Sequence, residues 1–185
     1  MIQCSALLVV SMSAVLLQGC TRDPNVRKQK YLKSGENYVA KGKQQEAIIE
    51  FSNAIKIDHN YAAAHYDLAK AYMKMGAVAG GYAELQRTVD LDPSNIQARL
   101  DLGTLLLAAH QYPRSTAQAN AILAIQPNNA DAIALLSSIA LAQGDRAQAL
   151  TQIQRALVID PNRSNFHADL ALIQGADPEI GRAHV

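Results

Sequence analysis

The segment VDLDPSN, residues 89–95, places an Asp-Pro pair in the middle of a chain that is otherwise rich in Ala, Leu and Gln. Similar segments recur along the chain: IKIDHNY at 55–61, LAIQPNN at 123–129 and LVIDPNR at 157–163. Their equivalent residues are spaced by 34 positions and are His59, Pro93, Pro127 and Pro161. A constant period of this size indicates a repeat architecture in which each repeat is one supersecondary unit.

The Asp-Pro pair predicts a corner between two helices. Pro93 disfavours the helical conformation in Asp92 and has no N–H to donate to the preceding turn, so a helix is expected to end there. Ser94 or Asn95 can then accept a hydrogen bond from the free amides of the next helix as its N-cap. We therefore interpret the segment as a structural corner and assign it no catalytic role.

Small residues recur at two columns of the repeat. With Lys28 as the first position, the repeats are 28–61, 62–95, 96–129 and 130–163, and a fifth begins at Ser164. A larger side chain would force the backbones apart where two helices of a hairpin cross closely. The small columns therefore predict such crossings: the eighth holds Gly35, Ala69, Gly103, Ser137 and Ala171, and the twentieth holds Ala47, Gly81, Ser115 and Ala149.

Other columns hold large residues, or a residue at which a helix ends. Mostly large residues, expected to fill the space between hairpins, occupy the seventh column (Ser34, Leu68, Leu102, Leu136, Leu170) and the twenty-fourth (Phe51, Leu85, Ala119, Ile153). At the fifteenth column, glycine is expected to accept the left-handed conformation of a helix C-terminus. Gly42, Gly76 and Gly144 occupy it, and His110 is the exception.

This pattern of small, large, small, large and Pro resembles the tetratricopeptide repeat family over residues 28–163. The resemblance implies an all-α fold: a solenoid of antiparallel helix hairpins with four full repeats and a partial fifth, wound as a right-handed superhelix. Some positions depart from the family pattern, and they make local packing less certain, chiefly in the third repeat: Ser34, His59, Gly81, Thr88, His110, Ala119 and Ile122.

Composition and motifs argue against catalysis. The 185 residues suffice for one domain, and 49% hydrophobic but only 5% aromatic residues suit helices built on Ala and Leu. A formal net charge of +1 provides no global field to recruit nucleic acid. The chain lacks His-Glu-x-x-His, paired Cys-x-x-Cys, Gly-x-Ser-x-Gly and phosphate-loop patterns. Packing or surface roles are expected for His59, His65, His110 and His167, and we expect no enzyme activity, metal, cofactor or small-molecule substrate.

The N-terminus has the pattern of an export signal. Residues 1–19 carry no charged side chain, and SALLVVSMSAVLL at 5–17 is a continuous apolar run too short for a comfortable membrane span. The following LQGC, residues 17–20, resembles the lipobox of bacterial lipoproteins. In that family the Cys is acylated after cleavage before it, which implies a signal peptide at 1–19, a lipid on Cys20 and a short linker over 20–27. Cys4 would leave with the signal peptide.

By the same resemblance, Thr21 in place of an Asp favours lipid anchoring in the outer membrane, facing the periplasm. The alternatives are an uncleaved signal anchor or a buried free cysteine. Residues 22–43 are rich in Lys and Arg. They form either a solvated helix face or a surface that lies near anionic lipid headgroups.

In the family, the first helix of each hairpin lines a concave groove. Carried onto this sequence, the partner-binding groove would be lined by an apolar stripe with a few polar residues: Leu32, Glu36, Tyr66, Lys70, Met73, Leu100, Thr104, Leu107, Ser138 and Leu141. The stripe could instead be packed between neighbouring first helices. As a groove it would bind an extended or helical segment of another protein.

We therefore expect a lipid-anchored adaptor of the bacterial envelope that binds proteins of an assembly or export system. It resembles repeat lipoproteins of exopolysaccharide export and exosortase systems, and more distantly those of type IV pilus and outer-membrane protein assembly. The alternatives are the interaction or regulatory part of a larger truncated protein with a catalytic region elsewhere, and a peptidoglycan-associated structural protein.

The C-terminal sequence is expected to be incomplete. Residues 164–175 match only the first helix of a fifth repeat. The last seven residues, EIGRAHV at 179–185, resemble the translation of a sequencing adapter. Residues 176–185 are accordingly expected to be a non-native or disordered tail, and the gene to continue past about Asp177.

Overall fold

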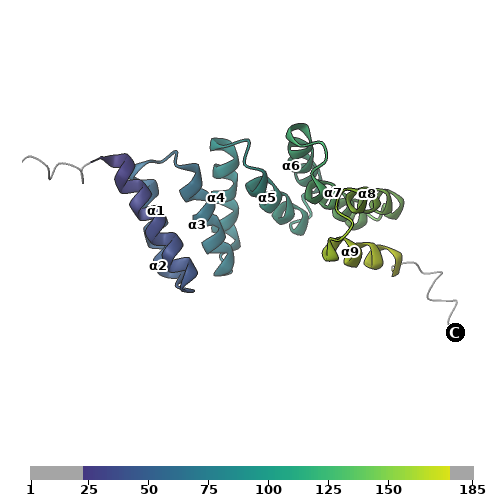
Figure 1. The fold of residues 1–185 in the computed structure, drawn as a ribbon, viewed down its shortest axis with the longest axis horizontal. Helices are drawn as coiled ribbons and strands as arrows, with labels where there is room; N and C mark the ends of the chain where they lie inside the picture. Colours follow the sequence, from purple (N-terminus) through teal and green to yellow (C-terminus); the bar gives the residue numbers. More distant parts are fainter. Residues whose placement is uncertain (1–22, 176–185) are drawn as a thin grey trace, which may run out of the picture. The chain divides into compact units, whose positions relative to one another are not determined.

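The computed structural model describes residues 23–175, and all of the regular secondary structure in this range is α-helical (Figure 1). The helices are α1 (Pro24–Ala40), α2 (Gln44–Ile57), α3 (Ala62–Lys74), α4 (Val78–Leu91), α5 (Ile96–Ala108), α6 (Tyr112–Ile125), α7 (Ala130–Ala142), α8 (Arg146–Ile159) and α9 (Ser164–Gly175). Short corners join them, in the all-α repeat order expected from the sequence. None of these helices is both long enough and apolar enough to cross a bilayer.

The chain divides into two compact units, residues 1–76 and 77–185. Within the described part, the first unit holds α1–α3 and the second holds α4–α9. The boundary therefore lies between the two helices that the 34-residue register assigns to the second repeat. In each unit, helices that follow one another in the chain pack side by side, and in the second unit α5 also contacts α7, and α7 contacts α9.

Several predicted features lie outside the described residues, namely the signal segment, Cys20, Thr21 and the tail at 176–185. At the N-terminal edge, α1 begins at Pro24, and the Asp23 side chain caps it by accepting a hydrogen bond of 2.8 Å from the Asn25 amide. Residues 24–27, which were expected to belong to a linker, are therefore helical.

The corners end and begin helices as the sequence predicts. Of the two expected caps after Pro93, Asn95 is the one used, and its Oδ1 accepts from the Ala98 amide at 3.0 Å. Asn129 does the same for α7, accepting from the Ala132 amide at 2.9 Å.

A basic side chain lies against the carbonyl oxygen of every residue that marks the repeat. In three repeats it comes six residues later, from His65 at 3.1 Å, Arg99 at 2.7 Å and His167 at 2.8 Å. In the third repeat Arg155 of the following hairpin donates to the Pro127 carbonyl at 3.1 Å. The corner carbonyls, which no helical amide reaches, are satisfied in this way. His65 is buried, as expected for a packing role, whereas His167 is exposed.

The fifteenth column adopts the left-handed conformation in all four full repeats. Its φ angle is 72° at Gly42, 74° at Gly76 and 82° at Gly144. His110, the exception in residue type, has a φ of 56° and shares the conformation. An L-residue with a Cβ is disfavoured there, so the corner after α5 carries a backbone strain that the other three corners avoid.

Small residues at the eighth and twentieth columns bring the helices of a hairpin together. In α5 and α6 the buried Ser115 hydroxyl donates to the Gly103 carbonyl at 2.7 Å, and in α7 and α8 Ser137 donates to the Ala149 carbonyl at 2.7 Å. Hydroxyl-to-backbone contacts of this kind require the two helix backbones to approach closely. The small columns therefore mark the crossings that the sequence predicts.

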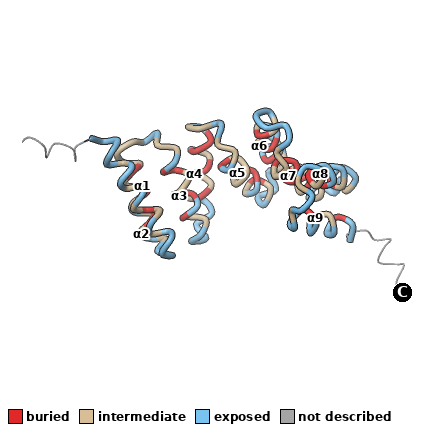
Figure 2. The backbone as a smooth tube through the Cα atoms, viewed as in Figure 1, coloured by how far each residue is buried: buried red, intermediate tan, exposed pale blue. Residues whose placement is uncertain are grey.

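The third repeat packs fully despite its departures from the family pattern. Ala119 and Ile122 are completely buried. Ala119 joins Leu135 and Ile139 in one core cluster, with Leu107 packed against it, so large residues from neighbouring helices fill the volume that a larger side chain would occupy. Figure 2 shows the buried residues on the faces where helices of one unit meet.

Candidate functional site

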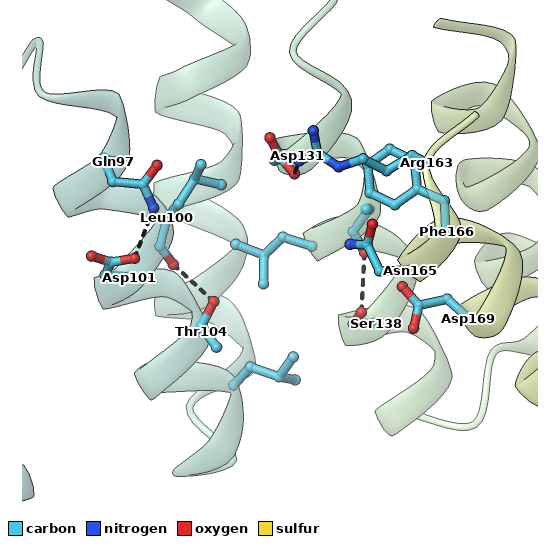
Figure 3. A pocket seen from close by; sticks show the side chains of 13 residues that line it. Gln97, Leu100, Asp101, Thr104, Asp131, Ser138, Arg163, Asn165, Phe166 and Asp169 are labelled. Carbon is cyan, nitrogen blue, oxygen red and sulfur yellow. Dashed lines mark hydrogen bonds and ion pairs between the residues drawn. The ribbon is translucent and has the colours of Figure 1, made fainter. Parts of the chain in front are cut away.

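A pocket of about 360 Å³ opens between the first helices of three successive repeats, α5, α7 and α9 (Figure 3). The helical spacing of three, four and seven residues places one face of each helix toward it. The residues that line it are Gln97, Leu100, Asp101, Thr104, Leu107, Asp131, Ala134, Leu135, Ser138, Arg163, Asn165, Phe166 and Asp169. It therefore combines apolar side chains with carboxylate, amide and hydroxyl groups.

One ion-pair network lies at the edge of this pocket. Arg163, in the corner before α9, pairs with Asp131 at the start of α7. Its other guanidinium nitrogen lies 3.5 Å from Asp160, and the group sits 5.2 Å from the centre of the Phe166 ring. The single cation among the lining residues is thus already shared between two carboxylates and an aromatic face.

The hydroxyl groups of the pocket are bound to their own helices. Thr104 donates to the Leu100 carbonyl at 2.9 Å, and Ser138 donates to the Ala134 carbonyl at 3.1 Å. Asp101 accepts a hydrogen bond of 3.0 Å from the Gln97 side chain. These polar groups shape the wall of the pocket, and the two hydroxyls keep their oxygen lone pairs available as acceptors.

Asp169 differs from the other carboxylates of the pocket. Its side chain points from α9 toward Ser138 of α7 (Figure 3). Among residues 23–175 its carboxylate has no hydrogen-bond or ion-pair partner, and partial burial raises the pKa of this carboxyl above its ordinary value. The ionised form is thus partly desolvated without a compensating cation.

A second pocket, of about 570 Å³, lies in the other unit between α1, α2 and α3. Its charged groups are partly paired, since Lys70 lies 2.8 Å from Asp67 and Lys33 donates to Glu36 at 2.9 Å. The residues that line it are Glu36, Val39, Ala40, Gly42, Gln44, Phe51, Asp67, Lys70, Ala71 and Lys74.

The structure brings the predicted groove residues together in two separate groups. Four of them line the pocket in the second unit, namely Leu100, Thr104, Leu107 and Ser138. Glu36 and Lys70 line the pocket in the first unit. The remaining predicted residues, Leu32, Tyr66, Met73 and Leu141, line neither of these pockets.

Part of the apolar stripe is packed, as the alternative interpretation of the sequence proposed. Leu32 packs against the core of the first unit, and Leu107 and Leu141 pack against the cores of the second. Leu107 belongs to both descriptions, because it is half-buried and also lines the pocket. Whether the predicted residues bind a partner stays a prediction.

Several lining residues were not predicted from the sequence, namely Asp101, Leu135, Arg163, Asn165, Phe166 and Asp169. A signal for two of them was present, because the sixth column holds Asp67, Asp101 and Asp169. Asn165 is at the second column of the partial fifth repeat, the column that holds Gln97 and Asp131 of this pocket in the third and fourth repeats. Within residues 23–175, no group of three or more His, Cys, Asp and Glu side chains is arranged to hold a metal ion.

The fold defines the class of protein: a repeat protein of helical hairpins whose first helices line pockets. Residues 35–76 match the family model described as TPR repeat. No curated protein sequence matches the chain significantly. The match shows a tetratricopeptide repeat at residues 35–76, and the helical hairpins of the described residues have the tetratricopeptide-repeat fold.

Solved structures agree on this fold. MamA (residues 41 to the end) from Desulfovibrio magneticus RS-1 superposes with a TM-score of 0.71 at 20% identity, covering 80% of this chain and 83% of MamA. PilF from Pseudomonas aeruginosa gives 0.70 at 18% identity, with 81% and 68% covered. YrrB, described as a TPR protein with an unusual peptide-binding site, gives 0.69 at 24% identity, with 78% and 75% covered.

Proposed function

We propose that this protein is a lipid-anchored scaffold of the bacterial cell envelope. It binds extended or helical segments of partner proteins on the concave face of its repeats, in the assembly or export of envelope components. The observation that carries the proposal is the pocket between α5, α7 and α9, where successive first helices expose apolar and polar side chains together. YrrB, which shares the fold, has a peptide-binding site according to its description.

The pocket is suited to a polypeptide segment more than to a small substrate. It is open, its hydroxyls are engaged by their own helices, and its floor includes the buried side chains of Leu135 and Phe166. An extended or helical segment can place one side chain in such a pocket and continue along the neighbouring first helices.

The groove is tested with a matched pair of variants. Thr104 and Thr151 are both exposed helical threonines whose hydroxyl donates at 2.9 Å to the carbonyl four residues earlier, but only Thr104 lines the pocket. In Thr104→Arg the long side chain fills the pocket, so we expect capture of envelope partners to be lost, whereas Thr151→Arg retains it. Both variants should keep the helical circular dichroism of the parent.

Equal capture by Thr104→Arg and Thr151→Arg would refute a role for this pocket. In that case partners would bind elsewhere on the surface or not at all. A loss of helical signal in Thr104→Arg alone would instead show that the site is part of the folded core.

The anchor is tested separately at Cys20. The LQGC segment supports acylation of this residue, with more than one acyl chain giving stable attachment. We expect the parent to fractionate with membranes and incorporate labelled fatty acid, and Cys20→Ser to do neither. A parent protein recovered in the soluble fraction with residues 1–19 still attached would refute the anchor while leaving the groove untouched.

A further inference from the structure

The pocket between α5, α7 and α9 has an excess of negative charge. Its lining includes three carboxylates, Asp101, Asp131 and Asp169, and one cation, Arg163. The cation is paired with Asp131 and lies 3.5 Å from Asp160, which is outside the lining set. Arg163 therefore does not neutralise the part of the pocket around Asp169.

Asp169 is the carboxylate of this pocket that lacks a partner within the described residues. Its carboxylate has none among residues 23–175, and burial already disfavours its ionised form. Ser138, toward which it points, donates its hydroxyl proton to the Ala134 carbonyl and cannot donate to the carboxylate as well. Partial desolvation of an unpaired carboxylate disfavours its ionised form, and a bound cation offsets that effect.

The apolar side chains of the pocket favour a cation that is carried on a methylene stem. Leu135 and Phe166 are buried residues that line the same pocket, and Leu107 is half-buried. The methylene stem of a Lys or Arg side chain packs on such surfaces while its charged end reaches a carboxylate. An acidic segment would be repelled by Asp101 and Asp169, and an apolar segment would bury Asp169 without a partner.

From this charge complementarity we propose that the pocket between α5, α7 and α9 binds an extended partner segment through a Lys or Arg side chain, with Asp169 as its counter-ion. The inference rests on the proposed function, because it names the chemistry of the segment that the groove holds. Asn165, on the same face of α9, supplies an amide oxygen as a second acceptor for the cation.

The test is a selection from a displayed library of random decapeptides on the full chain in detergent. We expect the peptides selected by the parent to be enriched in Lys and Arg. For a selected Lys peptide, Asp169→Asn should weaken binding about tenfold, the size of one charge-assisted hydrogen bond. Asp90→Asn is the matched control, because it removes the same charge from an exposed position on α4, outside the pocket.

A chemical double-mutant cycle isolates the contact. Replacing the peptide Lys by norleucine keeps the stem and removes the charge, so it should weaken binding to the parent about tenfold and hardly affect binding to Asp169→Asn. An equal effect of norleucine on both proteins, or selected peptides without excess Lys or Arg, would overturn the counter-ion role and leave the groove standing. If the parent selects no peptides beyond those selected by Thr104→Arg, both the groove and its cationic occupant are refuted.

Discussion

In the first unit, Phe51 of α2 lies against the backbone of α1 at Gly35, where there is no side chain, and replacing Gly35 by Ala tests whether this contact requires glycine. A Cβ built on Gly35 would lie 2.6 Å from Cδ1 and 2.8 Å from Cζ of Phe51, and closer still to Cε1. Carbon atoms in contact are normally separated by about 3.5–4.0 Å. Phe51 cannot withdraw easily, because its ring is only 1% exposed and is enclosed by Ala47, Leu68 and Ala71.

The sign of the effect follows from two opposing contributions. In the interior of a helix, Ala stabilises by about 1 kcal/mol relative to Gly. Overpacking a filled core costs about 1–3 kcal/mol, and three ring atoms inside contact distance favour the upper end of that range. Gly35→Ala should therefore lower the free energy of unfolding by about 2 kcal/mol. Adding Phe51→Leu removes the ring and should restore most of this loss.

Urea denaturation followed by circular dichroism at 222 nm measures the difference. Gly103→Ala is the internal comparison. Its Cβ would lie 2.7 Å from Cδ2 at the flexible end of Leu135, and its next neighbours, at 3.4 Å and 3.8 Å, are at ordinary contact distance, so a smaller loss is expected. A Gly35→Ala protein about 1 kcal/mol more stable than the parent would show helix propensity alone. That result would refute the conclusion that Gly35 is required by the approach of Phe51.

Three further predictions concern local features of the two units. His110→Gly should raise the free energy of unfolding by about 0.5–1 kcal/mol, because glycine relieves the strain of the left-handed conformation. Gly42→Ala should lower the free energy of unfolding by about 1 kcal/mol for the same reason, although the new Cβ would meet no atom within 4 Å. Ser115→Ala should lower it by about 1 kcal/mol, because the buried hydroxyl loses its bond to the facing helix; an unchanged urea midpoint would contradict this. The hydrogen bond from Lys28 lowers the pKa of Asp58. The contribution of this pair to the free energy of unfolding is therefore present above the unfolded pKa of about 3.8, and it is lost as the pH falls through the lower folded pKa. Lys28→Met should remove this part of the acid sensitivity in urea midpoints measured across that range.

The sequence was sufficient for the features that arise within one repeat. The spacing of Pro93 and Pro127 predicted the corners, and Asn95 was one of two residues expected to cap the next helix. The small residues Gly103 and Ser115 predicted a helix crossing, and they are joined by a hydrogen bond of 2.7 Å. These outcomes were predictable because caps, turns and helix faces depend on residues a few positions apart, whose periodicity is visible in the chain.

The candidate site was predictable only in part. Thr104 and Ser138 were assigned to the groove from their columns, and both line the pocket. Leu32 and Leu141 were assigned in the same way and pack against the cores. A column shows which face of a helix a residue occupies, but the depth to which neighbouring helices cover that face depends on how the repeats pack.

By itself the sequence determined the repeat period, the hairpin corners and the all-α class of this protein, because these follow from local backbone preferences and the 3.6-residue period of a helix. Only the tertiary structure decided that Arg163 pairs with Asp131, while Asp169 has no partner within residues 23–175. Arg163 and Asp131 are 32 residues apart, the first in the corner before α9 and the second in α7, so their pairing exists only once the hairpins have stacked. Whether a charged side chain is paired depends on that stacking, since a partly buried carboxylate gains or lacks a counter-ion through contacts between repeats.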